Sequence, residues 1–310
     1  MEQNTMEQKL EKYIKGTYTI NEDGSIDVNG DVDLIRQNLD KIPFNFNKIS
    51  GDFWCQNNKL TSLEGAPKEI GGNFNCSYNQ LKTLVGGPEK LRENFDCSWN
   101  KLKTLEGAPK RIIHIFDCSN NKLKTLEGGP IYVGRNFYCW NNLLETLEGG
   151  PIYVNGDFWC QNNKLISLKG IPKEGNGDFN CYDNELKSLK GGPEEVGGNF
   201  LCQNNKLKTL KGAPKEIDRN FNCSYNRLIT LKGGPKKVGT YFDCHSNQLE
   251  TLKGAPKKVG IDFDCHSNLL KTLKGTPKEV GGNFDCSDNK IQFNKDKVKK
   301  ISKVKGKIYC

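Results

Sequence analysis

The segment FDCHSNQLETLKGAPKKVGID, residues 242–262, decides the fold, because the chain repeats its pattern at a fixed period of 21 residues. Phenylalanine lies two residues before the cysteine of each repeat and asparagine three residues after it. Leucines follow at plus five and plus eight in all but the last repeat. A strict period of this length is typical of a solenoid, in which each repeat buries its apolar face against the next one. Twelve cysteines mark the period: Cys55, Cys76, Cys97, Cys118, Cys139, Cys160, Cys181, Cys202, Cys223, Cys244, Cys265 and Cys286.

The composition is polar for a folded chain. Only 35% of the 310 residues are hydrophobic, and the net charge is +9. A solenoid can still build a core, because its few apolar positions recur in register and stack. The sequence has no apolar run long enough to span a membrane, and its start, MEQNTMEQKLEKYIKG, lacks the apolar core of a signal peptide. We therefore expect one elongated array, cytoplasmic and without membrane contact.

The cysteines are expected to be buried free thiols. Successive cysteines occupy the same place on parallel strands about 4.8 Å apart, so their side chains point the same way. A disulfide needs Cβ atoms that face each other. No CxxC or CxxxH pair offers a zinc-finger spacing. The sequence therefore predicts no structural metal and no cofactor.

Written from the strand, the repeat is F-x-C-x-x-N-x-L-x-(T/S)-L-x-G-x-P-x-x-(V/I)-G-x-x. This pattern resembles the leucine-rich repeat, with Phe and Cys in the two strand leucine positions. The short period and the proline of the return segment are similar to the bacterial effector class of that family. The tandem G-A-P-K-E-V-G-G-x-F-x-C units also resemble leucine-rich-repeat proteins encoded by bacteriophages. The resemblance covers roughly residues 30 to 294 and implies a binding scaffold without naming a partner.

The residues favour the same shape on their own. Phe and Cys at alternate positions of an extended segment point to one face. The asparagine that follows is expected to turn its amide inward, onto backbone groups where the chain leaves the strand. Gly and Pro in the return arm exclude an α-helix there. We predict a β-rich, leucine-rich-repeat-like solenoid with right-handed coils, a parallel β-sheet on the concave face and an extended, polyproline-like convex side.

The ends of the array differ from its middle. Residues 1–30 predict an N-terminal helix and a β-hairpin that caps the first layer. Residues 31–294 predict about thirteen 21-residue coils, of which the first, with Val32 and Leu34 in the inward positions, is degenerate. Asn294 stands where a leucine is expected, and residues 295–310 predict a basic C-terminal cap or tail.

Aromatic residues interrupt the polar columns that flank the cysteines. Trp and Tyr are frequent in binding hot spots, so these residues are candidate partner contacts on the concave face. The alternative is cross-strand packing that only protects the sheet. The candidates are Tyr138, Trp140, Trp159 and Tyr182 from three consecutive coils, and Trp54 near the N-terminal end.

A second cluster repeats the tripeptide Asp-Cys-His in two consecutive coils. Two histidines and their carboxylates could hold a divalent metal or form an acid–base pair. A duplicated repeat copies any motif, however, and nothing in the sequence encloses this face. We therefore treat Asp243, His245, Asp264 and His266 as secondary partner contacts.

Lysines change the charge of the return arm halfway along the chain. The residue before the return glycine is Glu64, Glu106, Glu127 and Glu148 in early coils, and later Lys169, Lys190, Lys211, Lys232, Lys253 and Lys274. Such a row could follow a polyanion backbone, or it could only keep the array soluble.

Enzyme signatures are absent, since no phosphate loop, nucleophile elbow or H-E-x-x-H motif occurs. Three functions remain: non-catalytic protein binding, which the sequence favours, a structural or virion component, and nucleic-acid or other polyanion binding.

Overall fold

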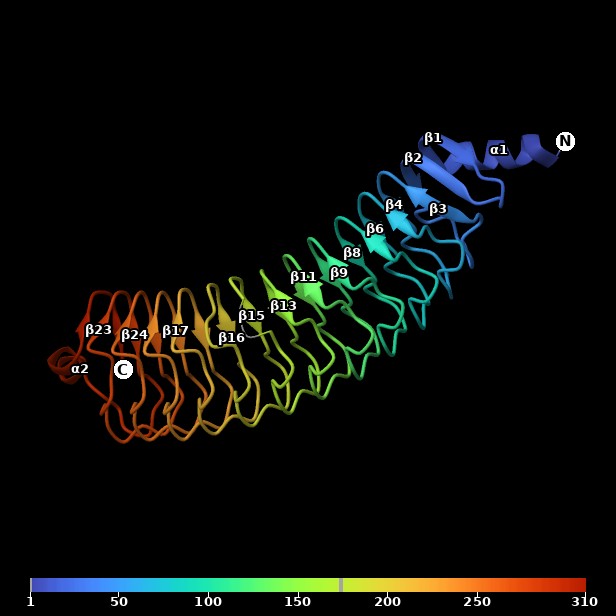
Figure 1. Cartoon of the computed structure of the whole chain (residues 1–310). Coiled ribbons are helices and arrows are strands. Elements are labelled where there is room, and N and C mark those ends of the chain that lie inside the picture. Colours follow the sequence, from blue (N-terminus) through green and yellow to red (C-terminus); the bar gives the residue numbers. More distant parts are fainter. Residues whose placement is uncertain (1, 173–174) are drawn as a thin grey trace. The chain divides into compact units, whose positions relative to one another are not determined.

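The computed structural model describes residues 2–172 and 175–310 (Figure 1). They fall into two compact units. Unit 1 comprises Met1–Leu144 and Glu148–Val154, and unit 2 comprises Glu145–Leu147 and Asn155–Cys310. No helix among the described residues is both long and apolar enough to cross a membrane.

Unit 1 begins with helix α1 (Glu2–Tyr13) and the antiparallel strands β1 (Ile14–Ile20) and β2 (Ile26–Asp33). The turn between these strands places Gly24 at φ 79°, in the left-handed region that glycine adopts without a Cβ clash. Strand β2 also starts the parallel sheet, because its Val32 pairs with Phe53 of the next coil. Val32 and Leu34 are fully buried. The first, degenerate repeat therefore supplies a regular layer of the core.

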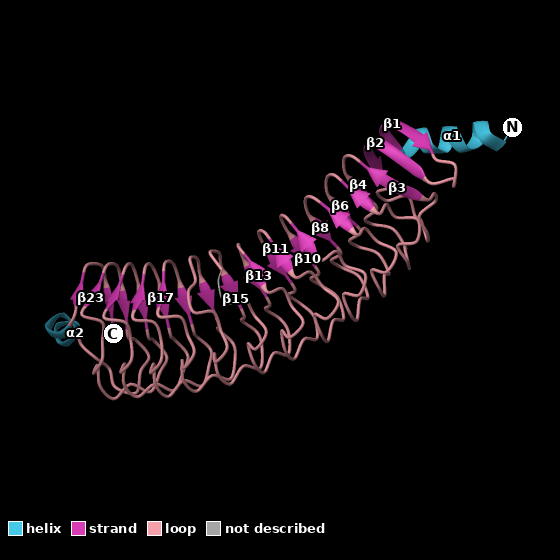
Figure 2. Cartoon of the chain, viewed as in Figure 1, coloured by secondary structure: helices cyan, strands magenta, loops and turns pink. Residues whose placement is uncertain are grey.

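The coils of unit 1 build two runs of very short parallel strands (Figure 2). In the first run, which we call the main sheet, phenylalanine pairs with phenylalanine from coil to coil. Its strands are β4 (Phe53–Trp54), β6 (Phe74–Asn75), β8 (Phe95–Asp96), β10 (Phe116–Asp117) and β12 (Phe137–Tyr138). The second run lies on the return arms: β3 (Phe46–Ile49), β5 (Glu69–Ile70), β7 (Lys90–Leu91), β9 (Arg111–Ile112), β11 (Tyr132–Val133) and β13 (Tyr153–Val154).

Unit 2 repeats this arrangement. Its main-sheet strands are β14 (Phe158–Trp159), β15 (Phe179–Asn180), β16 (Phe200–Leu201), β18 (Phe221–Asn222), β20 (Phe242–Asp243), β22 (Phe263–Asp264), β24 (Phe284–Asp285) and β26 (Ile308–Tyr309). Its return-arm strands are β17 (Glu216–Ile217), β19 (Lys237–Val238), β21 (Lys258–Val259), β23 (Glu279–Val280) and β25 (Lys303–Val304). The return arm is thus more regular than an extended segment, because a second parallel sheet forms along it.

The basic C-terminal segment continues the coils. Asn294 caps helix α2 (Lys295–Ile301) by accepting a hydrogen bond from the Lys297 backbone N–H at 2.8 Å. After the helix, β25 pairs with β23, and β26 pairs with β24. These last sixteen residues therefore add one more layer to both sheets of unit 2.

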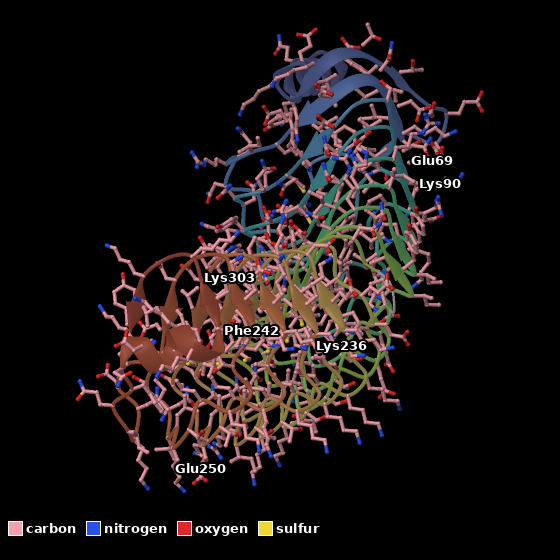
Figure 3. All side chains as sticks on the ribbon, turned by 90° about the vertical axis from the view of Figure 1, so that its left-hand side faces the viewer. Glu69, Lys90, Lys236, Phe242, Glu250 and Lys303 are labelled. Atoms are coloured by element: carbon pink, nitrogen blue, oxygen red, sulfur yellow. The ribbon has the colours of Figure 1, made fainter. Side chains whose placement is uncertain are left out.

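The core is a ladder of identical side chains. Phe242 (labelled in Figure 3) and Phe263 are stacked with ring centroids 5.2 Å apart. The twelve periodic cysteines are buried and free, which confirms the prediction made from their parallel side chains. Burial raises the pKa of the Cys55 and Cys181 thiols far above the ordinary range. These thiols behave as small apolar groups rather than as nucleophiles.

The periodic asparagine ties each coil to the previous one, as predicted. Asn247 Nδ2 donates to the carbonyl oxygens of Cys223 and Cys244, at 3.0 and 3.1 Å. Asn247 Oδ1 accepts the Leu228 backbone N–H at 2.9 Å. One side chain therefore bonds three buried backbone groups, and the two carbonyls also accept from the asparagines of the coils before and after.

Candidate functional site

The outer face of the main sheet carries the residues directly before and after each cysteine. All five aromatic candidates lie there and are half-buried. Lys15 Nζ lies 5.6 Å from the centroid of the Trp54 ring, within cation–π range. The Tyr138 hydroxyl accepts a hydrogen bond from Asn136 Nδ2 at 2.6 Å. Tyr138 and Trp140 belong to unit 1, and Trp159 and Tyr182 belong to unit 2, so their action as one patch stays a prediction.

A stacked aromatic pair that the sequence analysis missed is more exposed. The rings of Tyr78 and Trp99 are parallel within 9°, with centroids 5.2 Å apart, and 49% and 46% of the two residues face solvent. Both residues have positive φ, 53° and 54°, a backbone conformation that is uncommon for bulky side chains. The available signal was their position, two residues after the cysteine, where most coils carry Asn, Asp or Ser.

A second exposed surface, larger than the Tyr78–Trp99 pair, lies on the return arms of unit 1. Strands β9, β11 and β13 pair in parallel, and Tyr132 and Tyr153 stack with ring centroids 4.8 Å apart. The residues before the two tyrosines are exposed isoleucines, linked by a hydrogen bond from the Ile152 N–H to the Ile131 carbonyl. We call this surface the apolar cluster: Ile113 (38% exposed), Ile131 (53%), Tyr132, Ile152 (76%) and Tyr153 (38%).

The sequence held a signal for the apolar cluster as well. The segment GGPIYV occurs twice, at 128–133 and 149–154, where most coils carry a charged residue after the proline. Lys68, Lys110 and Lys236 occupy the place of the isoleucines in other coils. Only the formation of the second sheet shows that these side chains point outward in register.

The rim of the apolar cluster is positively charged. The Arg111 guanidinium carbon lies 4.0 Å from the Tyr132 ring centroid, a close cation–π contact. Arg92, Lys110 and Arg135 are exposed on neighbouring coils. Two nearby acidic groups are paired: Glu69 contacts Lys90 at 2.7 Å (Figure 3), and Glu93 contacts His114 at 2.6 Å.

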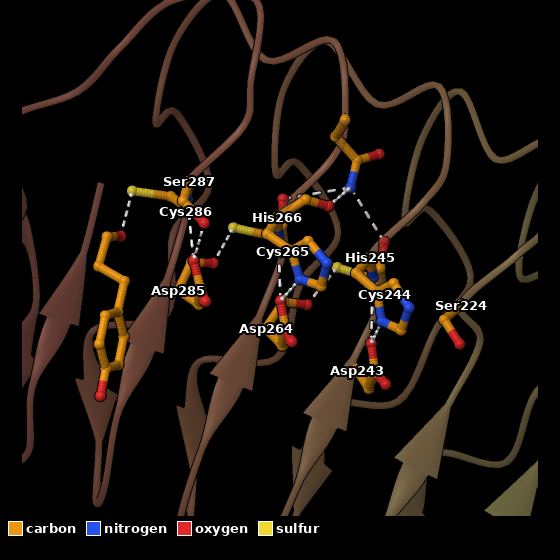
Figure 4. A network of polar contacts seen from close by, with 12 residues as sticks. Ser224, Asp243, Cys244, His245, Asp264, Cys265, His266, Asp285, Cys286 and Ser287 are labelled. Atoms are coloured by element: carbon orange, nitrogen blue, oxygen red, sulfur yellow. Dashed lines mark hydrogen bonds and ion pairs between the residues drawn. The ribbon is translucent and has the colours of Figure 1, made fainter.

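The Asp-Cys-His motifs of unit 2 form two identical local pairs (Figure 4). His245 Nδ1 lies 2.6 Å from Asp243 Oδ1, and His266 Nδ1 lies 2.7 Å from Asp264 Oδ1. Since a carboxylate only accepts, each Nδ1 is the donor, which leaves Nε2 as the second ring nitrogen. Ser224 donates to Asn222 in the same way through its hydroxyl. Each histidine therefore makes the side-chain hydrogen bond to the residue two positions before it that serine makes in other coils.

These pairs shift the acidity of their groups. Burial raises the pKa of Asp243 above its ordinary value. Burial alone lowers the pKa of His266, but its hydrogen bond with Asp264 and the surrounding carboxylates outweigh that effect and raise it. At a given pH, a larger fraction of His266 is therefore protonated than of a free imidazole.

The same cluster could supply metal ligands. Ligand atoms of His245, Asp264 and His266 lie within 4.8 Å of one another. The imidazole rings are parallel within 8°, with centroids 4.5 Å apart, and both are bonded through Nδ1. Their Nε2 lone pairs therefore point the same way, whereas a tetrahedral zinc ion needs nitrogens that converge at about 2.0–2.1 Å. The side chains do not converge on one ion without rotating out of their hydrogen bonds.

One further acidic pair lies on adjacent strands of unit 1. Asp96 of β8 and Asp117 of β10 are register partners. Burial and the neighbouring Asp96 charge raise the pKa of Asp117 to about 6, against the hydrogen bonds from Ser119. This carboxyl titrates close to neutral pH because the sheet removes it from water and sets it beside a like charge.

Comparisons with known proteins support the fold. No family model matches the chain, and no curated protein matches its sequence. Among solved structures, YopM from Yersinia enterocolitica matches with a TM-score of 0.56 and 19% identity, over 85% of this chain and 61% of that one. A leucine-rich effector protein, YopM from Yersinia pestis, matches with a TM-score of 0.47 and 17% identity, over 90% and 88% of the two chains.

The chain has the leucine-rich-repeat fold. The predicted solenoid with a parallel sheet is therefore confirmed. At this level of identity the likeness extends to the fold alone. The chain spans 61% of the length of the Yersinia enterocolitica protein.

Proposed function

We propose that the protein is a non-catalytic scaffold that binds a partner protein, with the apolar cluster of unit 1 as the anchor. The observation that carries the proposal is the exposure of Ile131 and Ile152 beside the stacked Tyr132 and Tyr153. Exposed apolar residues that adjoin one another are typical of interaction sites, whereas single ones are normal. Burying each isoleucine against a partner would contribute roughly 1–2 kcal/mol.

The repeat itself does not require this apolar surface. Lys68, Lys110 and Lys236 stand in the isoleucine position of other coils, and Glu69 and Glu216 stand in the tyrosine position. Those coils keep the same strand pairing. The isoleucines and tyrosines are thus additions to the scaffold, and partner binding gives them a role that packing does not.

The rim indicates the chemistry of the partner. Arg111 contacts Tyr132 of the apolar cluster, and Arg92 and Arg135 are exposed on neighbouring coils. Glu69 and Glu93 are already paired. A segment that presents an apolar side chain flanked by carboxylates complements this surface. Electrostatic complementarity of this kind favours fast association and correct register.

The aromatic residues of the main sheet are proposed as further contacts with the partner. Trp and Tyr supply large contact areas at low entropic cost. The proposed contacts are Tyr138, Trp140, Trp159, Tyr182 and Trp54, with Asp243, His245, Asp264 and His266 as secondary contacts.

We propose a source for the partner from the tandem repeats. Their resemblance to phage-encoded leucine-rich-repeat proteins supports a bacterial host protein as the target, and the host cytoplasm as the place of action. This step is an analogy of sequence pattern.

The test compares three purified forms as bait in a bacterial lysate: wild type, Ile131→Lys/Ile152→Lys, and Ile166→Lys/Ile229→Lys. The last variant is a matched control, because Ile166 and Ile229 are 60% and 59% exposed but lie outside the apolar cluster. We expect a protein that wild type and control retain and the cluster variant loses. Equal recovery with all three forms would contradict the proposal. Self-association abolished only by the cluster variant would contradict it too, in favour of an assembly component.

A further inference from the structure

A repeated pentapeptide carries two lysines around each of four return-arm turns of unit 2. K-G-x-P-K occurs in four consecutive coils, at 211–215, 232–236, 253–257 and 274–278. All eight lysines are exposed. We call them the lysine strip: Lys211, Lys215, Lys232, Lys236, Lys253, Lys257, Lys274 and Lys278.

The turns hold the lysine strip in a fixed geometry. In the third pentapeptide, the Ala255 N–H donates to the Leu252 carbonyl at 3.0 Å, and Gly254 has φ 98°. This places Lys253 at the second position of a type II turn, where a side chain points away from the coil. The proline that follows fixes the backbone further.

Successive pentapeptides are also tied to one another. The Lys236 N–H donates to the Lys215 carbonyl at 2.7 Å, and the Lys278 N–H donates to the Lys257 carbonyl at 2.8 Å (Lys236 is labelled in Figure 3). Neighbouring coils of a parallel sheet lie about 4.8 Å apart. Lys211 and Lys215 line the same surface groove, of about 810 Å³, so the two lysines of this coil face one side. The groove is also lined by Lys190 and by the carboxylates Glu194, Glu195, Glu216 and Asp218.

The lysines of the strip are not held in direct ion pairs. Among the described residues, no ion pair or side-chain hydrogen bond engages the Nζ of a strip lysine. The adjacent lysines do find partners, since Lys237 lies 3.9 Å from Glu216 and Lys258 lies 3.4 Å from Glu279. Residues 211–310 contain 21 basic and 10 acidic residues, an excess of 11 positive charges in a chain whose net charge is +9.

The fold does not impose this sign of charge. Glu64, Glu106 and Glu127 occupy the same turn position in unit 1, and the glycine after each of them also has positive φ. Like charges on neighbouring strands are destabilising, and a soluble surface needs only a mixture of signs. Repulsion within a row of unpaired lysines therefore destabilises the free protein, and binding a polyanion would relieve this repulsion.

We propose that the lysine strip binds the phosphodiester backbone of a nucleic acid. Evenly spaced ammonium groups on a rigid edge suit an evenly spaced row of phosphates. The pentapeptides contain no aromatic side chain for base stacking and no Asn, Gln or Arg for reading base edges. Binding is therefore independent of base sequence. This activity is separate from the apolar cluster of unit 1 and does not depend on it.

The test measures fluorescence anisotropy of labelled single-stranded and double-stranded oligonucleotides of random sequence, at salt concentrations from about 50 to 200 mM. The strip variant is Lys232→Glu/Lys253→Glu/Lys274→Glu, which copies the glutamates of unit 1. The control, Lys164→Glu/Lys187→Glu/Lys208→Glu, changes the net charge by the same amount on exposed lysines of unit 2 outside the strip. Circular dichroism checks that both variants fold.

We expect the strip variant to bind at least about tenfold more weakly than wild type. The slope of the logarithm of the binding constant against the logarithm of the salt concentration should become shallower by about one unit for each lysine changed. The control should stay within about twofold of wild type, since its lysines make no phosphate contact. Single-stranded and double-stranded arms show which form of the backbone fits the strip. Equal losses in both variants, no binding at low salt, or binding only to phosphatidylserine vesicles would overturn the proposal.

Discussion

Asn247 joins its own coil to the preceding one through its hydrogen bond with Leu228, in which Oδ1 accepts the backbone N–H at 2.9 Å. The same side chain donates to two cysteine carbonyls. Because all these groups are buried, the repeat depends on one amide per coil for its backbone partners. Propensity alone would not hold two-residue strands together.

Replacing Asn247 by alanine should therefore destabilise the protein strongly. The buried Leu228 N–H would be left unsatisfied at a cost of about 1–3 kcal/mol, and the two cysteine carbonyls would each lose one of two asparagine donors. We expect a loss on the order of 3 kcal/mol in the free energy of unfolding, from urea titration followed by circular dichroism. Gln248→Ala is the control, because Gln248 is exposed; similar losses in both variants would contradict the role of the amide.

The raised pKa of Asp117 gives stability a definite pH dependence. The pKa is about 6 in the folded protein and about 3.9 in an unfolded chain. The unfolded state therefore loses its proton first, and stability decreases as the pH rises from about 4 through 6. Asp117→Asn should remove this decrease and raise stability at pH 7 by on the order of 2 kcal/mol.

Asn75 and Asn222 occupy the same position in other coils, so the Asp117→Asn variant can keep the turn that Ser119 closes. Thermal melting at several pH values checks the prediction. A wild type whose stability rises steadily between pH 4 and 6, with no difference from the variant, would refute it.

Thiol reactivity should separate the periodic cysteines from the terminal one. Burial raises the thiol pKa of Cys55 and Cys181, so their thiolate is scarce at pH 8. All twelve periodic cysteines are buried, so reagents cannot reach the sulfur. We expect a chromogenic disulfide reagent to modify Cys310 rapidly in the native protein, and all 13 cysteines only after denaturation. Several fast-reacting thiols in the native state would show that the core is open.

The pair of His266 and Asp264 should be visible by NMR titration. The pKa of His266 is raised, so its contribution to stability is full below the unfolded pKa and is lost as the pH rises through the folded value. Asp264→Asn should lower the His266 pKa, because the charge that favours imidazolium is gone. An unchanged pKa in the variant would contradict this assignment, and Asp31→Asn in unit 1 serves as control.

The register of the core could be predicted from the sequence because each buried side chain recurs every 21 residues. Phe242, Cys244 and Asn247 each have one inward place to occupy, and the period alone sets their neighbours. The degenerate first repeat was also predictable, since Val32 and Leu34 keep the spacing. Strict periodicity thus specifies the main sheet without any knowledge of long-range contacts.

Other features depend on tertiary structure and could not be predicted in this way. Phe284 pairs with Ile308, 24 residues later, so the three extra residues that accommodate α2 hide the last coil from a search at period 21. The exposure of Ile152 depends on the return-arm sheet, whose pairing is not encoded in a local pattern. Trp140 and Trp159 are predicted as partner contacts because they interrupt the polar columns beside the cysteines, although Tyr78 and Trp99 are more exposed.

The most direct test of the central claim is site-specific photo-crosslinking from the apolar cluster. A benzophenone side chain replaces Ile152 in one protein and Ile166 in another, both exposed positions, and each is irradiated in bacterial cells. The account predicts a crosslink to a separate protein from position 152, lost when Ile131→Lys is added, and none from position 166. The absence of a crosslink from position 152, or the same products from both positions, would contradict it.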